Sequence, residues 1–182
     1  KIIANVNGKH KRIFGWDVKA TSKKYQDFLN AFLPQLTAFL KKCNIQKNVY
    51  FHCSDEPSIN HLETYSAAVA ILRKHLNGFK IFDALSNVEF YNMGLVTTPV
   101  PANNHIEPFV EAGIRNPWTY YCCGQTQKVS NRFVHMPSSR NRIMGTQLYR
   151  YDCAGFLQWG FNFYYAQFSL FPIDPFTVLD SN

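Results

Sequence analysis

The sequence predicts an α/β protein, a partial (β/α)8 barrel of the TIM type. Two patterns favour this fold: strand-like and helical runs alternate along the chain, and polar or aromatic side chains follow most strand-like runs. A doubly wound sheet usually carries a glycine-rich phosphate loop after its first strand, and the sequence has no G-x-G-x-x-G or Walker motif. The 182 residues hold about six parallel strand-helix units, whereas a complete barrel has eight. We therefore expect residues 1–182 to form a single domain, the C-terminal part of a barrel in a longer chain.

The first half of the chain is expected to hold two strands and two helices. Residues 12–18 favour a short strand. Residues 21–43 carry apolar side chains at helical spacing, and Pro34 is expected to bend or split this helix. Residues 48–54 favour a buried strand. The following segment, about residues 57–75, favours a helix, in which the proline is tolerated in the first turn and Asn77-Gly78 ends the helix.

The second half continues the alternation with shorter elements. It is expected to contain strands at residues 79–85, 95–100, 118–124 and 155–164, and helices or turns at residues 87–94, 105–114 and 138–151. If the strands are parallel, their carboxyl ends meet at one edge of the barrel, where barrel enzymes place functional side chains. The side chains at these ends are Trp16, Asp17, Asp55, Glu56, Asp83, Ser86, Thr97, Thr98, Cys122 to Gln125, Trp159 and Asn162.

The composition is that of a folded globular protein, with 46% hydrophobic and 17% charged residues. The 19 Lys and Arg exceed the 12 Asp and Glu and give a formal net charge of +7. These basic residues are scattered, and no helix-turn-helix pattern, zinc-finger spacing or basic stripe connects them, so we expect no nucleic-acid partner. No apolar run approaches the length of a membrane span, and we expect no membrane association.

The cysteines, at positions 43, 53, 122, 123 and 153, show no C-x-x-C pair and no regular spacing. We expect reduced thiols and no metal site, while the adjacent Cys122 and Cys123 leave a vicinal disulfide open as an alternative. Lys1 begins no signal peptide. The cytoplasm is therefore slightly favoured, although the compartment of the full-length protein stays undetermined.

Asp55 and Glu56 are neighbouring acids at the end of a predicted strand, in the run "SDEPS". Two carboxylates in one site repel, so that one stays ionised while the other holds a proton, a division of labour that suits glycoside chemistry. Adjacent side chains of a strand point to opposite faces, so the two acids converge only if the chain turns there, and Pro57 favours such a turn. The alternative is that either acid caps the following helix, a contribution of about 0.3 to 1 kcal/mol.

Later segments place Trp, Tyr, Asn, Arg and Gln near two further strand ends, where their rings and amides suit a sugar. The alternative is an aromatic core with Arg140 and Arg142 paired to surface acids. Together with "SDEPS", the run W-x-Y-Y-C-C and the later R-x-R-I-x-G and G-F-L-x-W resemble the catalytic domain of glycoside hydrolase family 123, also catalogued as domain-of-unknown-function family 4091. The resemblance extends from about residue 14 to residue 164.

The resemblance implies a retaining β-N-acetylhexosaminidase that acts on terminal N-acetyl-β-galactosaminides and uses the acetamido group of the substrate as nucleophile. Carried over by motif position, Asp55 would orient and stabilise that group as it forms an oxazolinium intermediate. Glu56 would protonate the leaving oxygen and then activate water. The resemblance thus implies a carbohydrate substrate and neither a metal nor an organic cofactor.

Four further residues are predicted to bind the substrate because they are suitable side chains near strand ends. Trp159 would form the floor under the sugar, and Tyr121 and Asn162 would contact the acetamido group or the hydroxyls. His52 would support the acid pair, with an inward-packed histidine whose hydrogen bonds are satisfied as the alternative.

Two other functions stay open at this point. The chain is then either a non-catalytic carbohydrate-binding or scaffold domain with a glycosidase fold, or a glycosidase of different sugar specificity. The sequence does not predict an oligomeric state.

Overall fold

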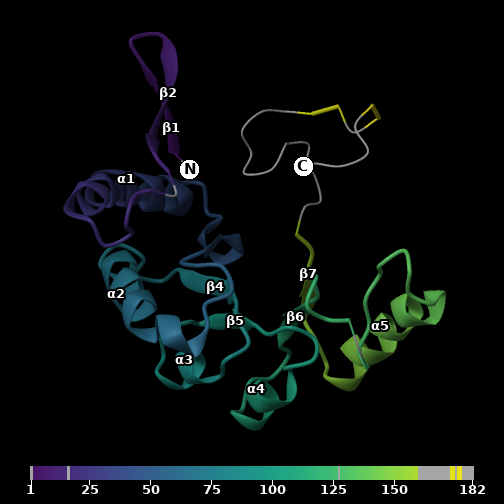
Figure 1. Ribbon diagram of the computed structural model, residues 1–182. Coiled ribbons are helices and arrows are strands. Elements are labelled where there is room, and N and C mark those ends of the chain that lie inside the picture. The colour runs from purple at the N-terminus through teal and green to yellow at the C-terminus, as the bar shows by residue number, and fades with distance from the viewer. Residues whose placement is uncertain (1, 16, 127, 160–172, 175, 178–182) are drawn as a thin grey trace.

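The computed structural model describes residues 2–15, 17–126, 128–159, 173–174 and 176–177 (Figure 1). The helices in these ranges are α1 Lys23–Lys42, α2 Leu62–Arg73, α3 Glu89–Asn92, α4 Glu107–Glu111 and α5 Ser138–Arg150, with short 3-10 helices at Gln46–Asn48 and Ile59–His61. Figure 1 shows helices α1 to α5 in an arc around the short central strands. None of these helices is long and apolar enough to cross a lipid bilayer.

The described strands are β1 Ile2–Val6, β2 Lys9–Phe14, β3 Tyr50–Phe51, β4 Lys80–Ala84, β5 Thr98–Val100, β6 Trp118–Tyr120 and β7 Gly155–Leu157. Strands β3, β4 and β5 pair in parallel in that order, and β6 pairs in parallel with β7. One parallel bridge between Ala102 and Tyr120 connects the two groups. This arrangement confirms the predicted mixed α/β class with parallel sheets.

The predicted partial barrel is not clearly present, because the strands form small separate sheets. Strand β3 has 2 residues, and β5, β6 and β7 have 3 each. Strands this short make few ladder hydrogen bonds, and the bridge at Ala102 and Tyr120 is the one pairing between the β5 and β6 segments in the described residues. The order of these helices and parallel strands agrees with the prediction, but the strands are shorter than predicted. For example, a strand is predicted at residues 48–54, and in the structure Tyr50–Phe51 are paired.

Strands β1 and β2 form an antiparallel hairpin that the sequence analysis does not predict. The turn between them is Asn7-Gly8, with φ angles of 53° and 77°. Two-residue hairpin turns favour Asn-Gly because both residues need a positive φ. The segment at residues 12–18 therefore does not begin the parallel series, and its residues 12–14 pair with the strand that precedes them.

Helix α1 continues through Pro34, so the proline does not split the helix. Leu29 and Leu33 before the proline, and Thr37 and Leu40 after it, are all buried. Burial of this continuous face stabilises the helix on both sides of the proline and offsets the missing backbone N–H.

Two hydrophobic clusters lie on opposite faces of the central strands. The larger cluster joins β4 to helices α1 to α4 and includes the fully buried rings of Phe90 and Phe109. The smaller cluster contains Ala84, Val100, Ala102 and Tyr120. In β4, Ile81 belongs to the larger cluster and Phe82 packs against the smaller one, as the alternation of side chains in a strand requires. Side chains of the smaller cluster therefore face away from the helices.

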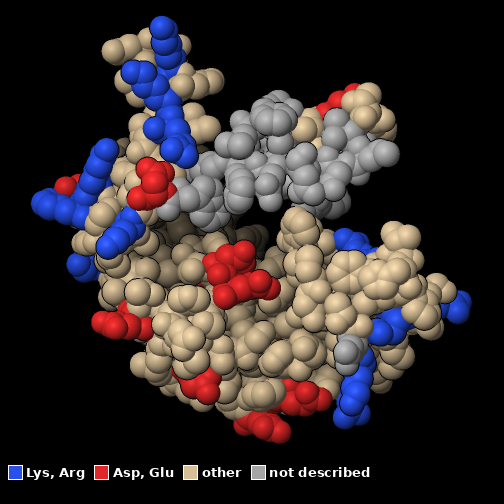
Figure 2. Space-filling view, viewed as in Figure 1, with Lys and Arg blue, Asp and Glu red and all other residues tan. Residues whose placement is uncertain are grey.

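Charged side chains are unevenly distributed over the surface in Figure 2. Lys and Arg lie over the β1–β2 hairpin and α1 on one side and over α5 on the other, and Asp and Glu lie between them. On this face the basic groups form no continuous surface. The excess positive charge of the sequence is therefore peripheral in this view.

The Phe90→Ala substitution tests the larger cluster. The ring is fully buried and meets the ring of Tyr65 edge-on at 4.9 Å, so its loss leaves a cavity under α2. We expect the free energy of unfolding to fall by roughly 3 to 5 kcal/mol, measured by urea denaturation. In the control Tyr149→Ala the side chain is 88% exposed, and we expect a change within about 0.5 kcal/mol.

Candidate active site

The chain turns at Asp55 and Glu56, shortly after strand β3. Strand β3 ends at Phe51, and Glu56 has a φ of 42°, an uncommon backbone conformation for a residue other than glycine. The backbone N–H of Glu56 donates a hydrogen bond of 3.0 Å to the carbonyl of Ala84, at the end of β4. The strand alternation that would separate the two acidic side chains therefore ends before Asp55.

Both acids act on one side chain, that of Tyr120. Oε1 of Glu56 accepts a hydrogen bond from the Tyr120 hydroxyl. Burial of the ring raises the pKa of Tyr120, the Glu56 carboxylate raises it further, and the Asp55 carboxylate adds a smaller increase, while Ser86 opposes them. Charge effects of this kind require proximity. The turn therefore brings Asp55 and Glu56 into the same neighbourhood, with a neutral phenol as their shared neighbour.

The structure does not support the alternative in which either acid caps the following helix. Ser58 occupies the N-cap of the 3-10 helix Ile59–His61, and its backbone N–H lies 3.1 Å from Nδ1 of His61. Glu56 is bonded to Tyr120 instead, and no hydrogen bond of the Asp55 carboxylate is present in the part of the chain that the structure describes.

Tyr120 and Tyr121 face opposite sides of β6 and its extension. Tyr120 belongs to the smaller cluster and reaches Glu56. Tyr121, the tyrosine that the sequence analysis favours, is 4% exposed, and its ring packs 4.8 Å from that of Phe156 in β7. The structure therefore brings Tyr120, not Tyr121, to the acid pair. The sequence predicts a tyrosine at this strand end, but the run "TYYC" does not reveal which of the two tyrosines points toward the acids.

The two predicted residues after β7 are placed differently. Trp159 follows β7 by two residues and is 57% exposed. Asn162 lies outside the described residues.

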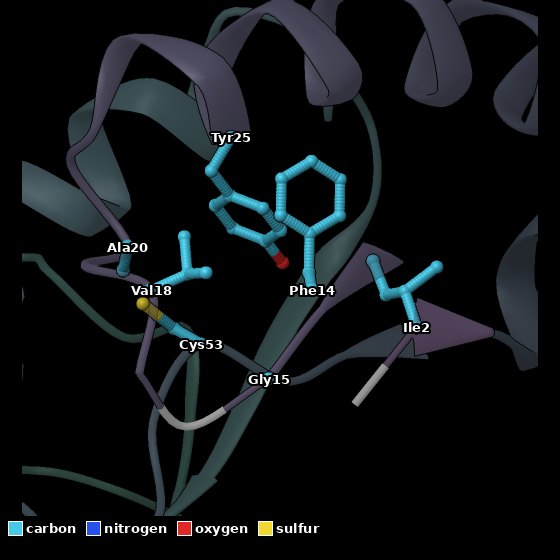
Figure 3. Close-up of a pocket in the computed structure, with 7 residues that line it drawn as sticks. All are labelled: Ile2, Phe14, Gly15, Val18, Ala20, Tyr25 and Cys53. Atoms are coloured by element: carbon cyan, nitrogen blue, oxygen red, sulfur yellow. The ribbon is translucent and has the colours of Figure 1, made fainter. Parts of the chain in front are cut away.

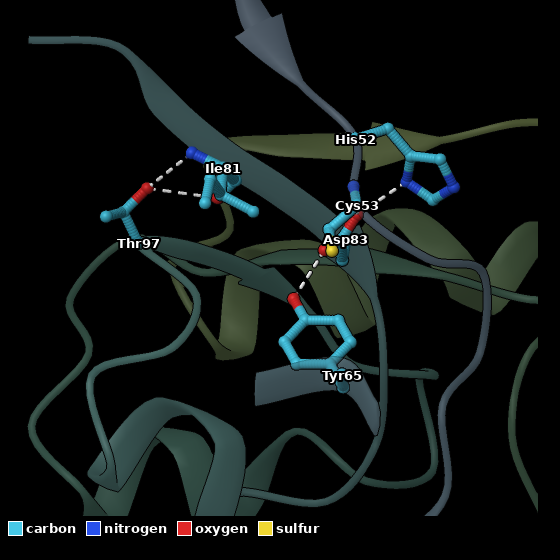
Figure 4. Close-up of polar contacts among 6 residues, drawn as sticks. All are labelled: His52, Cys53, Tyr65, Ile81, Asp83 and Thr97. Carbon is cyan, nitrogen blue, oxygen red and sulfur yellow. Dashed lines mark hydrogen bonds and ion pairs between the residues drawn. The ribbon is translucent and has the colours of Figure 1, made fainter. Parts of the chain in front are cut away.

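His52 forms a close pair with Asp83, a buried residue of β4 (Figure 4). The distance from Nδ1 of His52 to Oδ1 of Asp83 is 2.5 Å. This hydrogen bond raises the pKa of His52, partial burial of the ring opposes the increase, and the charges of Asp83 and Asp55 add to it. His52 is therefore neither inward-packed nor isolated: it is a partly exposed imidazole beside Asp55.

The loop after β6 is held by side-chain amides. The backbone N–H of Cys122 donates to Oε1 of Gln125 at 2.7 Å, and Nδ2 of Asn131 donates to the carbonyl of Cys122 at 2.9 Å. The Sγ atoms of Cys122 and Cys123 are 3.7 Å apart, and all five cysteines are free, as the sequence analysis expects. Gln125 and Asn131 thus hold the backbone of Cys122, and no vicinal disulfide joins Cys122 to Cys123.

A separate cavity of about 340 Å³ lies between the β1–β2 hairpin, the start of α1 and the segment after β3 (Figure 3). Its lining residues are Ile2, Phe14, Gly15, Val18, Ala20, Tyr25 and Cys53. Burial raises the pKa of the Cys53 thiol to about 12, so this sulfur stays protonated at neutral pH. The described residues that line the cavity include no carboxylate and no activated nucleophile, and we do not assign the chemistry to it.

At the acid pair, the described residues offer two exposed carboxylates, a neutral phenol donor and an imidazole that favours its charged form. Such a set can transfer protons and stabilise a developing positive charge. No group of three or more His, Cys, Asp or Glu in the described ranges is arranged to hold a metal ion. The two carboxylates, the phenol and the imidazole together suit acid–base chemistry.

Comparison with protein families identifies the kind of enzyme. Residues 2–181 match the family model "Glycoside hydrolase 123, catalytic domain". The chain belongs to this family. Membership of the glycoside hydrolase 123 family confirms the resemblance found in the sequence and indicates a glycosidase domain. A comparison with curated proteins gave no match.

Alkylation tests the assignment of Cys53 as an inert thiol of this glycoside hydrolase 123 domain. Because its pKa is about 12, the thiolate is scarce at pH 8.5, and we expect Cys53 to react with iodoacetamide at least about a hundredfold more slowly than the exposed Cys43. Peptide mass spectrometry of timed samples measures both rates. Equal rates would contradict the burial of Cys53.

Proposed function

We propose that this domain hydrolyses terminal N-acetyl-β-hexosaminides, with N-acetyl-β-galactosaminides as preferred substrates, by retaining, substrate-assisted catalysis. The observation that carries the proposal is the turn after β3, at which Asp55 and Glu56 share Tyr120 as a neighbour. Family membership supports the glycosidase class. The chemistry requires no metal or organic cofactor.

The two carboxylates have different tasks in the proposed reaction. The acetamido oxygen of the substrate attacks C1 while the bond from C1 to the leaving oxygen breaks, and Glu56 gives its proton to that oxygen. Asp55 holds the acetamido N–H and stabilises the positive charge of the oxazolinium intermediate. Glu56 then removes a proton from water, and the water oxygen attacks C1 as the bond from C1 to the acetamido oxygen breaks. The acetamido group is regenerated, and the second inversion restores the β configuration.

Neighbouring side chains support these tasks. The hydroxyl of Tyr120 fixes one oxygen of Glu56 and leaves the other for the leaving group or water. Both carboxylates are exposed, which leaves space for a sugar ring beside them. We propose His52 and the exposed ring of Trp159 as substrate contacts. For Tyr121 and Asn162, contact with the acetamido group or hydroxyls stays a prediction from the sequence.

We also propose that strands β3 to β7 are part of a (β/α)8 barrel. Their parallel pairing follows chain order, and the helices lie outside them in an arc (Figure 1). In such a barrel the carboxyl ends of the strands share one edge, which is where Asp55, Glu56 and Tyr120 lie.

The Glu56→Gln substitution tests the acid–base role. The amide keeps an oxygen that accepts the Tyr120 hydrogen bond but has no proton to give, so we expect kcat/KM for 4-nitrophenyl N-acetyl-β-galactosaminide to fall roughly 10² to 10⁴-fold. The matched control Glu111→Gln, at an exposed glutamate in α4, should keep the original rate.

Two further measurements separate the proposed mechanism from its alternatives. A thiazoline derived from N-acetylgalactosamine should inhibit, and 4-nitrophenyl β-galactoside, which lacks the acetamido group, should be hydrolysed far more slowly. Equal hydrolysis of both substrates would exclude substrate assistance. Saccharide binding that persists in the double variant Asp55→Asn, Glu56→Gln, with no turnover by the unchanged domain, would indicate a non-catalytic binding domain.

The pair Tyr120→Phe and Tyr121→Phe decides which tyrosine serves the acids. Each change removes one hydroxyl and keeps the ring. A hydrogen bond to a charged group contributes about 1.5 to 3 kcal/mol, so we expect at least about a tenfold loss of kcat for Tyr120→Phe. Tyr121→Phe should stay within about threefold of the unchanged domain, since no hydrogen bond of its hydroxyl is present among the described residues.

A larger loss of kcat in Tyr121→Phe than in Tyr120→Phe would favour the prediction from sequence. Thermal unfolding of both variants controls for stability.

A further inference from the structure

The carboxylate of Asp83 is completely buried and accepts three hydrogen bonds (Figure 4). Oδ1 accepts from Nδ1 of His52 at 2.5 Å and from the backbone N–H of Cys53 at 2.8 Å. Oδ2 accepts from the hydroxyl of Tyr65, in α2, at 2.5 Å. A buried carboxylate destabilises a fold unless such partners satisfy it. Here three donors satisfy the buried carboxylate of Asp83.

These contacts fix the orientation of His52. One oxygen of Asp83 binds both the ring of His52 and the backbone N–H of the next residue, Cys53, so ring and backbone are held together. Because a carboxylate oxygen accepts, Nδ1 carries the proton. Figure 4 shows the other ring nitrogen pointing away from Asp83. The side chain is 56% exposed, so this second nitrogen lies at the open edge of the site.

Several charged or titratable groups surround the imidazole. The carboxylate of Asp55, from the same segment, acts on the ring through its charge, and that of Asp83, from β4, is bonded to it. Tyr65 from α2 and Cys53 lie around the Asp83 carboxylate, and burial raises the pKa of both. The two carboxylates are thus the charges that act on His52, and both favour its protonated form.

We propose that Asp83 is a positioning residue that holds His52 in one orientation beside Asp55, with the second ring nitrogen available to the substrate. This inference rests on the proposed function. It gives the two acids different neighbours: Asp55 lies near an imidazole whose pKa is raised, whereas Glu56 has the neutral hydroxyl of Tyr120. An ionised carboxylate is the form of Asp55 that stabilises an oxazolinium ion.

The sign of the pH dependence follows from the raised pKa of His52. The imidazole is charged below its pKa in the folded protein and loses its charge as the pH rises through that value. Activity that depends on the charged ring is therefore lost on the alkaline side. Removal of the Asp83 charge lowers the pKa of His52, so this alkaline loss moves to lower pH.

The Asp83→Asn substitution tests the proposal. The asparagine is of equal size, and its oxygen still accepts from His52 and Cys53, but the negative charge is absent. In ¹⁵N-resolved NMR titrations of the ring we expect the pKa of His52 to fall by at least about one unit. With 4-nitrophenyl N-acetyl-β-galactosaminide we expect about a tenfold lower kcat and an alkaline limb shifted to lower pH.

Tyr65→Phe is the matched control, because it removes the donor on Oδ2 and leaves the contact with His52 intact. It should preserve the NMR titration of His52 and the alkaline limb, even if stability falls. An unchanged titration of His52 in Asp83→Asn, or equal behaviour of the two variants, would overturn the proposal.

Two results would require a further measurement: an Asp83→Asn variant that does not fold, and an unchanged domain without activity. If Asp83→Asn does not fold, as judged by circular dichroism, His52→Gln replaces it, and an unchanged alkaline limb in that variant overturns the proposal. If the unchanged domain hydrolyses no N-acetylhexosaminide, the proposed function fails. The NMR titration still decides whether Asp83 positions His52, because it requires no turnover.

Discussion

The hydrogen bonds to Asp83 join three parts of the chain that the sequence separates. Strand β4 supplies the carboxylate, the segment after β3 supplies the ring of His52 and the amide of Cys53, and α2 supplies the hydroxyl of Tyr65. Each donor offsets part of the cost of burying a charge, so the loss of any one lowers the stability of the fold. The segment between β3 and α2 carries the acid pair, and both of its ends are therefore tied to β4. A second bond, from the Glu56 N–H to the Ala84 carbonyl, fixes the middle of that segment.

Short strands are part of how this site is made. Strand β3 is two residues long, and its early end releases the chain from strand alternation before Asp55. The positive φ of Glu56 then turns the backbone, a conformation that costs about 1 to 2 kcal/mol for a residue with a side chain. Strain of this kind persists where surrounding contacts determine the conformation, and here those contacts are the Ala84 carbonyl and the Tyr120 hydroxyl. A longer, more regular strand would direct the two carboxylates to opposite faces.

Local charge matters more at this site than the net charge of +7. The basic residues visible in Figure 2 lie over peripheral elements, and acidic side chains lie between them. Near the acid pair, the ring of His52 is bonded to a buried carboxylate that raises its pKa, and the hydrogen bond to Glu56 comes from a neutral phenol. Neighbouring acids of the same kind thus acquire different surroundings, which is the condition for giving them different chemical roles. The same physical logic explains why Cys53, next to His52 in the chain, is inert: it faces an apolar cavity, where burial disfavours the thiolate.

The amino-acid sequence by itself indicated the order and approximate position of the helices and most parallel strands, that Asp55 and Glu56 follow a strand, and which family the chain resembles. Hydrophobic periodicity, caps and strand-end motifs are local properties, so they can be read without a partner segment. The tertiary structure decided the rest. It extended α1 through Pro34 because buried residues on both sides stabilise it, paired β2 with β1, limited the sheets to short ladders, and turned Tyr120 instead of Tyr121 toward Glu56. It also joined His52 to Asp83 across 31 positions of sequence. The register of a strand, the face to which a side chain points and the pairing of strands depend on contacts between distant segments. Those contacts form only when the chain is folded.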